Sequence, residues 1–209
     1  MSVWLVLLKL HGLKSGIAVD SLQLALSAFY VFGCAFRAFY PRADLQRIVI
    51  VDSPLSAVFW GRSVATVAEL AYAWQLSRWF DLPLLLPLLT VAELFSWYAI
   101  LTNRAMFNLL ENSLWTLAGV LIGFVSSSLV VRVGGALFVL FMVTTDLPMY
   151  YRRHVATPAR QYRGVREGAL LLLRDYRVTA ADADWREEWA WQLGYFSIFV
   201  WTSLFFTVA

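Results

Sequence analysis

The sequence predicts an all-α polytopic membrane protein, a compact bundle of six or seven transmembrane helices. Of its 209 residues, 60% are hydrophobic and only 15% are charged, whereas an ordinary soluble domain carries about 25% charged residues. Apolar runs of about 20 residues, the length that crosses about 30 Å of hydrocarbon, recur along the chain. The alternating pattern of a membrane β-barrel does not occur, so the spans are expected to be helices.

The first segment, residues 1–21, is expected to be an interfacial arm. Its apolar run from Met1 to Leu8 is followed by Lys9, and a run this short is typical of a segment that lies at the membrane surface. If this arm crosses the membrane instead, the chain has seven spans.

The next segment, residues 22–151, is expected to hold five transmembrane helices separated by short polar connections. The tight connection 78–81 separates the second span from the third, and Arg132, Gly134 and Gly135 form the expected hinge before the fifth. The expected spans are 22–40, 57–76, 82–101, 113–131 and 133–151.

A basic loop is expected at residues 152–188, with a surface helix over 167–176, before the final transmembrane helix at 189–209. The distribution of arginines orients this arrangement, because Lys and Arg accumulate in cytoplasmic loops. Most of them lie in the connection after the first span, at Arg104 and in the loop 152–188. We therefore expect these loops in the cytoplasm and both termini outside.

Several function classes are excluded or disfavoured by composition. The basic residues flank the membrane spans and do not form a basic domain with aromatic stacking platforms, so no nucleic-acid partner is expected. The single cysteine, Cys34, cannot close an intrachain disulfide, and both histidines, His11 and His154, lie outside the spans. No metal site and no cofactor are expected, and no serine or cysteine hydrolase arrangement is present.

Acidic residues inside the expected spans are the main functional signal, because each costs about 2.5 to 3.5 kcal/mol at the centre of a bilayer. Glu69, Glu93, Glu111 and Asp146 are the candidate catalytic residues. In spans of alternating direction they reach similar depth, so we expect them to line one cavity. A purely structural role, in which each carboxyl group bonds a neighbouring helix, is the alternative for any single one.

Polar and aromatic side chains near these acids are the candidate substrate-binding residues. Arg62 precedes Glu69 by seven residues and therefore shares its helical face, and Trp97 and Trp115 each follow a glutamate by four residues. Interfacial anchoring is the alternative for the tryptophans. The full set comprises Arg62, Asn108, Asn112, Trp97, Trp115 and Tyr150.

A five-residue segment recurs: Thr66 to Leu70 and Thr90 to Leu94 both read Thr-Val-Ala-Glu-Leu. An inverted repeat would produce this and would indicate a transporter, in which two halves meet at a midplane site. Chance recurrence of common residue types is the alternative.

The residue types that remain suit acid–base chemistry on a lipophilic substrate. A buried carboxyl group favours its protonated form and can act as a general acid, and aromatic faces stabilise a cation. This combination predicts protonation of an alkene or epoxide, followed by cyclisation or isomerisation. An isoprenoid or sterol-like small molecule and membrane lipids are the expected partners.

In size, in the acids Glu69 and Asp146, and in the segment from Asn108 to Trp115, the chain resembles the small membrane-integral terpene cyclases of meroterpenoid pathways. The resemblance implies a helical bundle with carboxyl groups of membrane helices as proton donors. The family tends to have seven helices and a Trp where this chain has Leu110. The segment Asn112 to Trp115 is also similar to sterol isomerases with a five-helix fold, whose catalytic histidine has no counterpart in these spans.

Two further function classes stay open. The first is a small proton-coupled transporter with Glu69 and Glu93 as half-sites, and the second is a non-catalytic subunit of a larger membrane assembly. Proton flux that disappears in Glu69→Gln would favour the transporter, whereas stable, monodisperse behaviour without a partner would count against the subunit.

Overall fold

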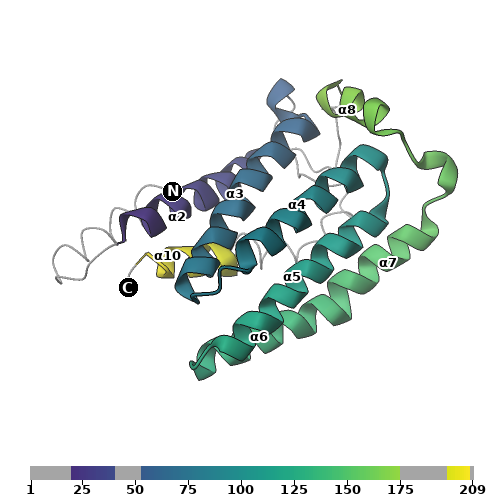
Figure 1. Cartoon of the computed structure of the whole chain (residues 1–209). Coiled ribbons are helices and arrows are strands. Elements are labelled where there is room, and N and C mark those ends of the chain that lie inside the picture. Colours follow the sequence, from purple (N-terminus) through teal and green to yellow (C-terminus); the bar gives the residue numbers. More distant parts are fainter. Residues whose placement is uncertain (1–19, 41–52, 175–196, 208–209) are drawn as a thin grey trace. The chain divides into compact units, whose positions relative to one another are not determined.

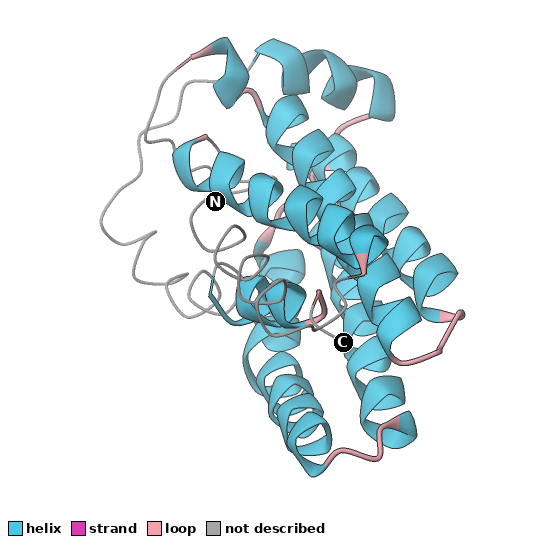
Figure 2. Cartoon of the chain, turned by 90° about the vertical axis from the view of Figure 1, so that its left-hand side faces the viewer, coloured by secondary structure: helices cyan, strands magenta, loops and turns pink. Residues whose placement is uncertain are grey.

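The computed structural model describes residues 20–40, 53–174 and 197–207, and these ranges are helical with short connections (Figure 2). No strand occurs within these ranges, in agreement with the expected all-α class. The expected interfacial arm, except its last two residues, lies outside them. So do the greater part of the loop after the first span, the last part of the basic loop and the first part of the final span.

The chain divides into two compact units, which are described separately: unit 2 is residues 80–174, and unit 1 is the remainder. Figure 1 labels the helices along the chain. In unit 1 the elements are α2 (Ser21–Phe39), the short 3-10 helix η1 (Pro54–Ser56), α3 (Val58–Trp79) and α10 (Phe199–Phe205). In unit 2 they are α4 (Leu85–Thr102), α5 (Ala105–Val125), α6 (Leu129–Phe141), the π-helical segment η2 (Met142–Asp146), α7 (Leu147–Ala156), η3 (Ala159–Gln161) and α8 (Val165–Arg174).

In unit 1, Asp20 caps the N-terminus of α2, and its carboxylate accepts the backbone N–H groups of Leu22 at 2.8 Å and Gln23 at 3.2 Å. A side-chain oxygen in this position satisfies amides that the first helical turn leaves unbonded. The amide of Gln23 and the guanidinium of Arg78, 2.9 Å from Asp20, hold the pKa of Asp20 below its ordinary value. The cap therefore also ties α2 to the end of α3.

The α2 and α3 helices pack closely because small residues face each other. A Cβ added to Gly33 would lie 2.5 Å from Cβ of Ala68, so only glycine fits there. Stripes of small residues permit this close approach of helices where lipid offers no hydrophobic driving force.

In unit 2, α4 and α5 form a helical hairpin. Pro87 lies in the first turn of α4, where its missing N–H removes no helical bond. Asn103 ends the helix in the left-handed conformation with φ of 55°, and the N–H of Arg104 bonds the carbonyl of Ala99 at 3.2 Å. This ending reverses the chain in two residues and sets α5 against α4.

The hinge expected at Arg132, Gly134 and Gly135 is not where the chain turns. The turn is the segment 126–128, and all three residues lie inside α6. Nε of Arg132 donates to the carbonyl of Ser126 at 2.7 Å and so caps the end of α5. Gly135 lies against α5, where an added Cβ would be 3.3 Å from the carbonyl oxygen of Gly119. Gly135 therefore provides close helix packing and not chain reversal, whereas a Cβ added to Gly134 would meet nothing within 4 Å.

Three helices of the described part are long and apolar enough to cross a membrane: α4, α5 and the continuous helix Leu129–Ala156. These helices also carry apolar side chains on their outer faces: Leu94, Leu117 and Leu137 are each about half exposed or more. No residue of α6 is buried. Exposed apolar surface on this scale is typical of a face that contacts lipid.

Exposed hydroxyl groups on these helices bond their own backbone. Thr90, Ser113 and Thr144 each donate to the carbonyl four residues earlier, at 2.7 Å. Such bonds hide the hydroxyl from an apolar environment. They explain how these residues occur on outward faces of apolar helices.

The basic loop expected at 152–188 begins later than the sequence indicates, because α7 continues to Ala156 and includes Arg152 and Arg153. Within the loop, α8 forms over Val165–Arg174, close to the expected surface helix at 167–176. Of the final span, the described part contains α10.

Candidate functional site

In unit 1, Glu69 accepts hydrogen bonds from two arginines. Arg62 lies seven residues earlier on the same face of α3 and donates to Oε2 of Glu69 at 3.1 Å, as the spacing predicts. Arg37 of α2 donates to Oε1 at 3.2 Å. All three side chains are at least nine-tenths buried. This second partner was not predicted. Arg37 lies inside the expected span 22–40, and a charged residue within a span needs a partner, which was the available signal.

A second polar network in unit 1 was not predicted, and it joins α2, α3 and α10. Gln75 donates to the carbonyls of Gln23 at 3.0 Å and Ser203 at 3.2 Å, while the hydroxyl of Ser203 donates to Oε1 of Gln75 at 2.6 Å. Tyr72 and Thr202 share a hydrogen bond of 2.8 Å beside it. A buried glutamine inside an apolar span was the available signal, because such a group needs partners.

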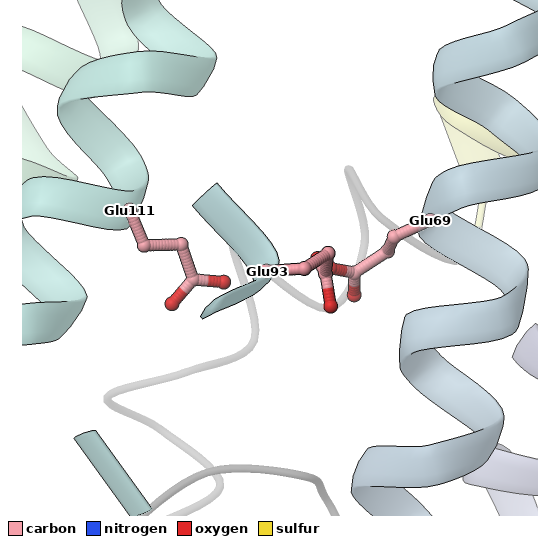
Figure 3. Close-up of side chains that lie close together, drawn as sticks. All are labelled: Glu69, Glu93 and Glu111. Atoms are coloured by element: carbon pink, nitrogen blue, oxygen red, sulfur yellow. The ribbon is translucent and has the colours of Figure 1, made fainter. Parts of the chain in front are cut away.

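In unit 2, α4 and α5 bring Glu93 and Glu111 together. Their carboxylate oxygens lie within 4.8 Å of each other, and the two residues are 2% and 8% exposed. Figure 3 shows the Glu111 side chain extending from α5 toward the helix that carries Glu93. Glu69, the third side chain drawn, belongs to α3 of unit 1. The structure thus pairs two of the four predicted acids within one unit.

Two asparagines lie beside Glu111 on α5. Nδ2 of Asn108 donates to Oε2 of Glu111 at 3.2 Å, and Nδ2 of Asn112 donates to the carbonyl of Asn108 at 3.0 Å. The span was expected to begin at residue 113, with these residues at its mouth; α5 instead begins at Ala105. The polar groups of Asn108, Glu111 and Asn112 bond one another or the backbone of α5. These bonds permit the three side chains to be buried within an apolar helix.

The carbonyl oxygen of the Asn108 side chain, Oδ1, is buried and accepts no hydrogen bond from any residue that the structure describes. An unsatisfied buried acceptor costs about 1 to 3 kcal/mol. Asn108 is 3% exposed. The oxygen is therefore suited to accept a donor from a bound molecule or water.

Asp146 lies at the end of η2, which packs against α5 in the same unit. It is 3% exposed. Pro148 follows in the first turn of α7, and π-helical turns are often found at functional sites. Tyr150 is buried one turn later, with the guanidinium of Arg153 5.6 Å from its ring centre.

Aromatic side chains flank the α4–α5 pair. Trp97 and Trp115, the predicted substrate-binding tryptophans, are both half-buried, four residues after Glu93 and Glu111. The rings of Phe95 and Phe107 stack between α4 and α5 with centroids 6.2 Å apart. Ser96, which was not predicted, is buried on the face of α4 that carries Glu93. The aromatic rings of the two tryptophans and two phenylalanines have negative faces that can stabilise a cation.

The chemistry available in unit 2 is that of carboxyl and amide oxygens. Carboxyl groups donate or accept protons, and the same oxygens are the ligand type of hard cations such as Mg²⁺. No arrangement of the described residues offers a histidine or thiol ligand beside this pair.

The chain was compared with known proteins at three levels. No family model, no curated protein and no solved structure matches it. The resemblance to terpene cyclases and sterol isomerases therefore stays a prediction from short motifs.

Proposed function

We propose that the chain is a membrane-embedded enzyme that uses carboxyl groups of unit 2 to cyclise or isomerise a lipophilic, isoprenoid or sterol-like substrate. The observation that carries this proposal is the buried pair of Glu93 and Glu111 within 4.8 Å. The pair lies between two helices that are apolar enough to span a membrane, which would place the acid in the layer where a lipophilic substrate dissolves.

The pair is suited to hold one proton. Two negative charges at this separation repel by about 3 kcal/mol at an effective dielectric constant of about 20, and protonation of one group removes the repulsion. The N–H donor of Asn108 on Glu111 favours the ionised form of that residue. We assign Glu111, which accepts this donor, as the base, and we place the shared proton on Glu93 as the acid, with Asp146 as a further acid.

In this scheme the proton of Glu93 adds to one carbon of a double bond, which leaves a carbocation on the substrate. Glu111 then accepts a proton from a carbon beside the cationic centre, and a new double bond forms. The product is an isomer or, where an internal alkene attacks the cation, a ring. The rings near α4 and α5, Trp97 and Trp115 among them, would stabilise the cation without reacting with it.

Glu69 receives a different assignment from that of the sequence analysis. Two arginine donors stabilise its carboxylate form, and a proton donor must be protonated before it acts. We assign Glu69 the role of holding α2 against α3, and we assign Arg62 the role of its charge partner. Asn108 and Asn112 orient the substrate, with Oδ1 of Asn108 as the acceptor for a substrate donor.

Infrared spectroscopy of the purified protein tests the stored proton. Near neutral pH, wild type is expected to show carbonyl absorption from protonated carboxyl groups, and Glu93→Gln is expected to lose the band that belongs to Glu93, whereas any contribution of Asp146 stays. Glu167→Gln, the same change at an exposed carboxyl group on α8, is the matched control and should keep the band. A band that persists unchanged in Glu93→Gln contradicts the assignment.

Extraction of lipids from the same preparations tests the substrate class. Glu93→Gln is expected to retain a prenyl, quinone or sterol-like compound at a higher level than wild type, because general acid catalysis contributes about 10² to 10⁴-fold. If both preparations contain phospholipid alone, the proposal of an enzyme acting on such a substrate is contradicted. Proton flux in liposomes that Glu93→Gln abolishes would support the transporter in its place.

A further inference from the structure

We propose that α8 lies in the membrane interface and, with the arginines around it, binds anionic lipid headgroups. This surface is independent of the acid–base proposal, because none of its residues contributes to the carboxyl pair. The α8 surface consists of α8 with its exposed apolar side chains Val165, Leu170 and Leu173, together with Arg104, Arg160, Arg163 and Arg166.

The position of α8 is fixed at the end of α4. The N–H of Arg163 donates to the carbonyl of Thr102 at 3.0 Å, and Nδ2 of Asn103 donates to the carbonyl of Gln161 at 3.1 Å. Gly168 lies so close to the backbone of Leu101 that no side chain would fit between them. Because α4 is one of the three helices able to cross a membrane, its end is expected at the interface. Figure 1 shows α8 beyond this end.

Among the residues of α8 whose burial the structure describes, those of one edge are covered. Gly168 and Leu172 are buried, whereas Leu170 and Leu173 are 53% and 56% exposed. Leucines left in water forgo the favourable transfer of their apolar surface out of water. A helix with an exposed apolar arc and basic side chains beside it is typical of one that lies in the headgroup region.

The charge around α8 is one-sided. Arg160 and Arg166 are exposed, and the guanidinium of Arg104 lies 4.8 Å from the ring centre of Tyr162. Glu167 is the one acidic residue between positions 157 and 174. Arginines near an anionic leaflet are attracted by its negative surface potential. The long arginine stems also allow the charge to reach headgroups while α8 lies deeper.

Spin labels on α8 test this surface in nanodiscs. The chain has one cysteine, and it is buried, so Cys34→Ala gives the background. A label at Leu173→Cys is expected to collide several-fold more with oxygen than with a water-soluble nickel chelate, relative to a label at Glu167→Cys on the polar side. Leu170→Cys is the second position, should Leu173→Cys fail to fold.

The lipid requirement is tested by comparing phosphatidylcholine discs with discs that also contain phosphatidylglycerol. The label at position 173 is expected to lie deeper with the anionic lipid, and Arg160→Gln with Arg166→Gln should remove that difference.

Three outcomes would overturn the proposal. Equal access of nickel to positions 173 and 167 would place α8 in water. Equal depth of the label in both kinds of disc would contradict a role for anionic lipid. Spin–spin coupling between copies would show that the surface is a dimer contact instead.

Discussion

At the level of single residues, the buried charges are not equivalent. Glu69 accepts hydrogen bonds from two arginines. Glu93 and Glu111 lie beside each other, so that two carboxyl groups meet, and Glu111 accepts an amide N–H. Removing one partner of a buried charge pair costs about 3 to 5 kcal/mol, since the other charge stays buried. The same residue type therefore has a different consequence at each position.

A double-mutant cycle on Glu69 and Arg62 measures this difference. Glu69→Gln is expected to lower the free energy of unfolding by about 3 kcal/mol, because two guanidinium groups lose their carboxylate. The double mutant, with Glu69→Gln and Arg62→Gln together, should lose less stability than the sum of the losses in the two single mutants. Thermal unfolding in mild detergent provides the measurement. Strict additivity would mean that the 3.1 Å contact between the two side chains does not contribute to stability.

At the level of helices, glycines set the packing of α5 against α6. Gly119 lies against the ring of Phe138, where an added Cβ would be 2.7 Å from Cδ1, and Gly135 faces Gly119 and Gly123. Gly119 and Gly123 are four residues apart on an apolar helix, the spacing of closely packed membrane helices.

Substitutions at two neighbouring glycines separate packing from helix propensity. Gly135→Leu is expected to destabilise the protein by about 1 to 3 kcal/mol through overpacking. Gly134→Leu is the matched control, since a Cβ there meets nothing within 4 Å and leucine favours helix. Thermal stability in the same detergent should fall for the first and hold or rise for the second. Equal effects would mean that α5 and α6 do not pack through Gly135.

The helices themselves could be predicted from apolar runs, and α2, α3 and α4 begin and end within a few residues of expectation. Their polar interior could be predicted only in part. The spacing of Arg62 and Glu69 lies within one helix and is visible in the sequence. The Arg37 contact to Glu69 joins two helices, and their relative rotation comes from packing at Gly33 and Ala68. Pairing across helices therefore needed the structure.

The repeated Thr-Val-Ala-Glu-Leu segment shows what such a short pattern does specify. In both α3 and α4 the alanine and the glutamate are buried, while Val67 and Val91 are exposed. The segment encodes which face of a helix is polar and inward. It does not encode what the glutamate contacts, and the transporter interpretation gains no support from it.

For the molecule as a whole, the two ends of unit 2 differ in charge. The end at which α4 and α7 finish carries Arg104, Arg152 and the arginines beside α8. The turn 126–128 at the other end has Arg132, whose Nε already caps α5. The positive-inside rule predicts that the first end faces the cytoplasm.

Cysteine labelling in intact cells tests this orientation in the Cys34→Ala background. Ser127→Cys, in the turn between α5 and α6, is expected to react with a membrane-impermeant maleimide. Ala159→Cys, in the exposed segment before α8, should react only after the cells are permeabilised. The reverse pattern would invert the predicted topology, and labelling of both would contradict a membrane-spanning unit 2.

The wide turn of η2 has a geometric consequence for the longest helix. Met142, Asp146 and Tyr150 are all buried, although they recur every four residues. In an α-helix of 3.6 residues per turn, such a series drifts around the axis by about 40° at each step. A π-helical turn holds more residues and cancels part of the drift. The inward direction of Asp146 and Tyr150 therefore depends on how many residues fill the turn, and one insertion or deletion there would reorient them without changing any side chain.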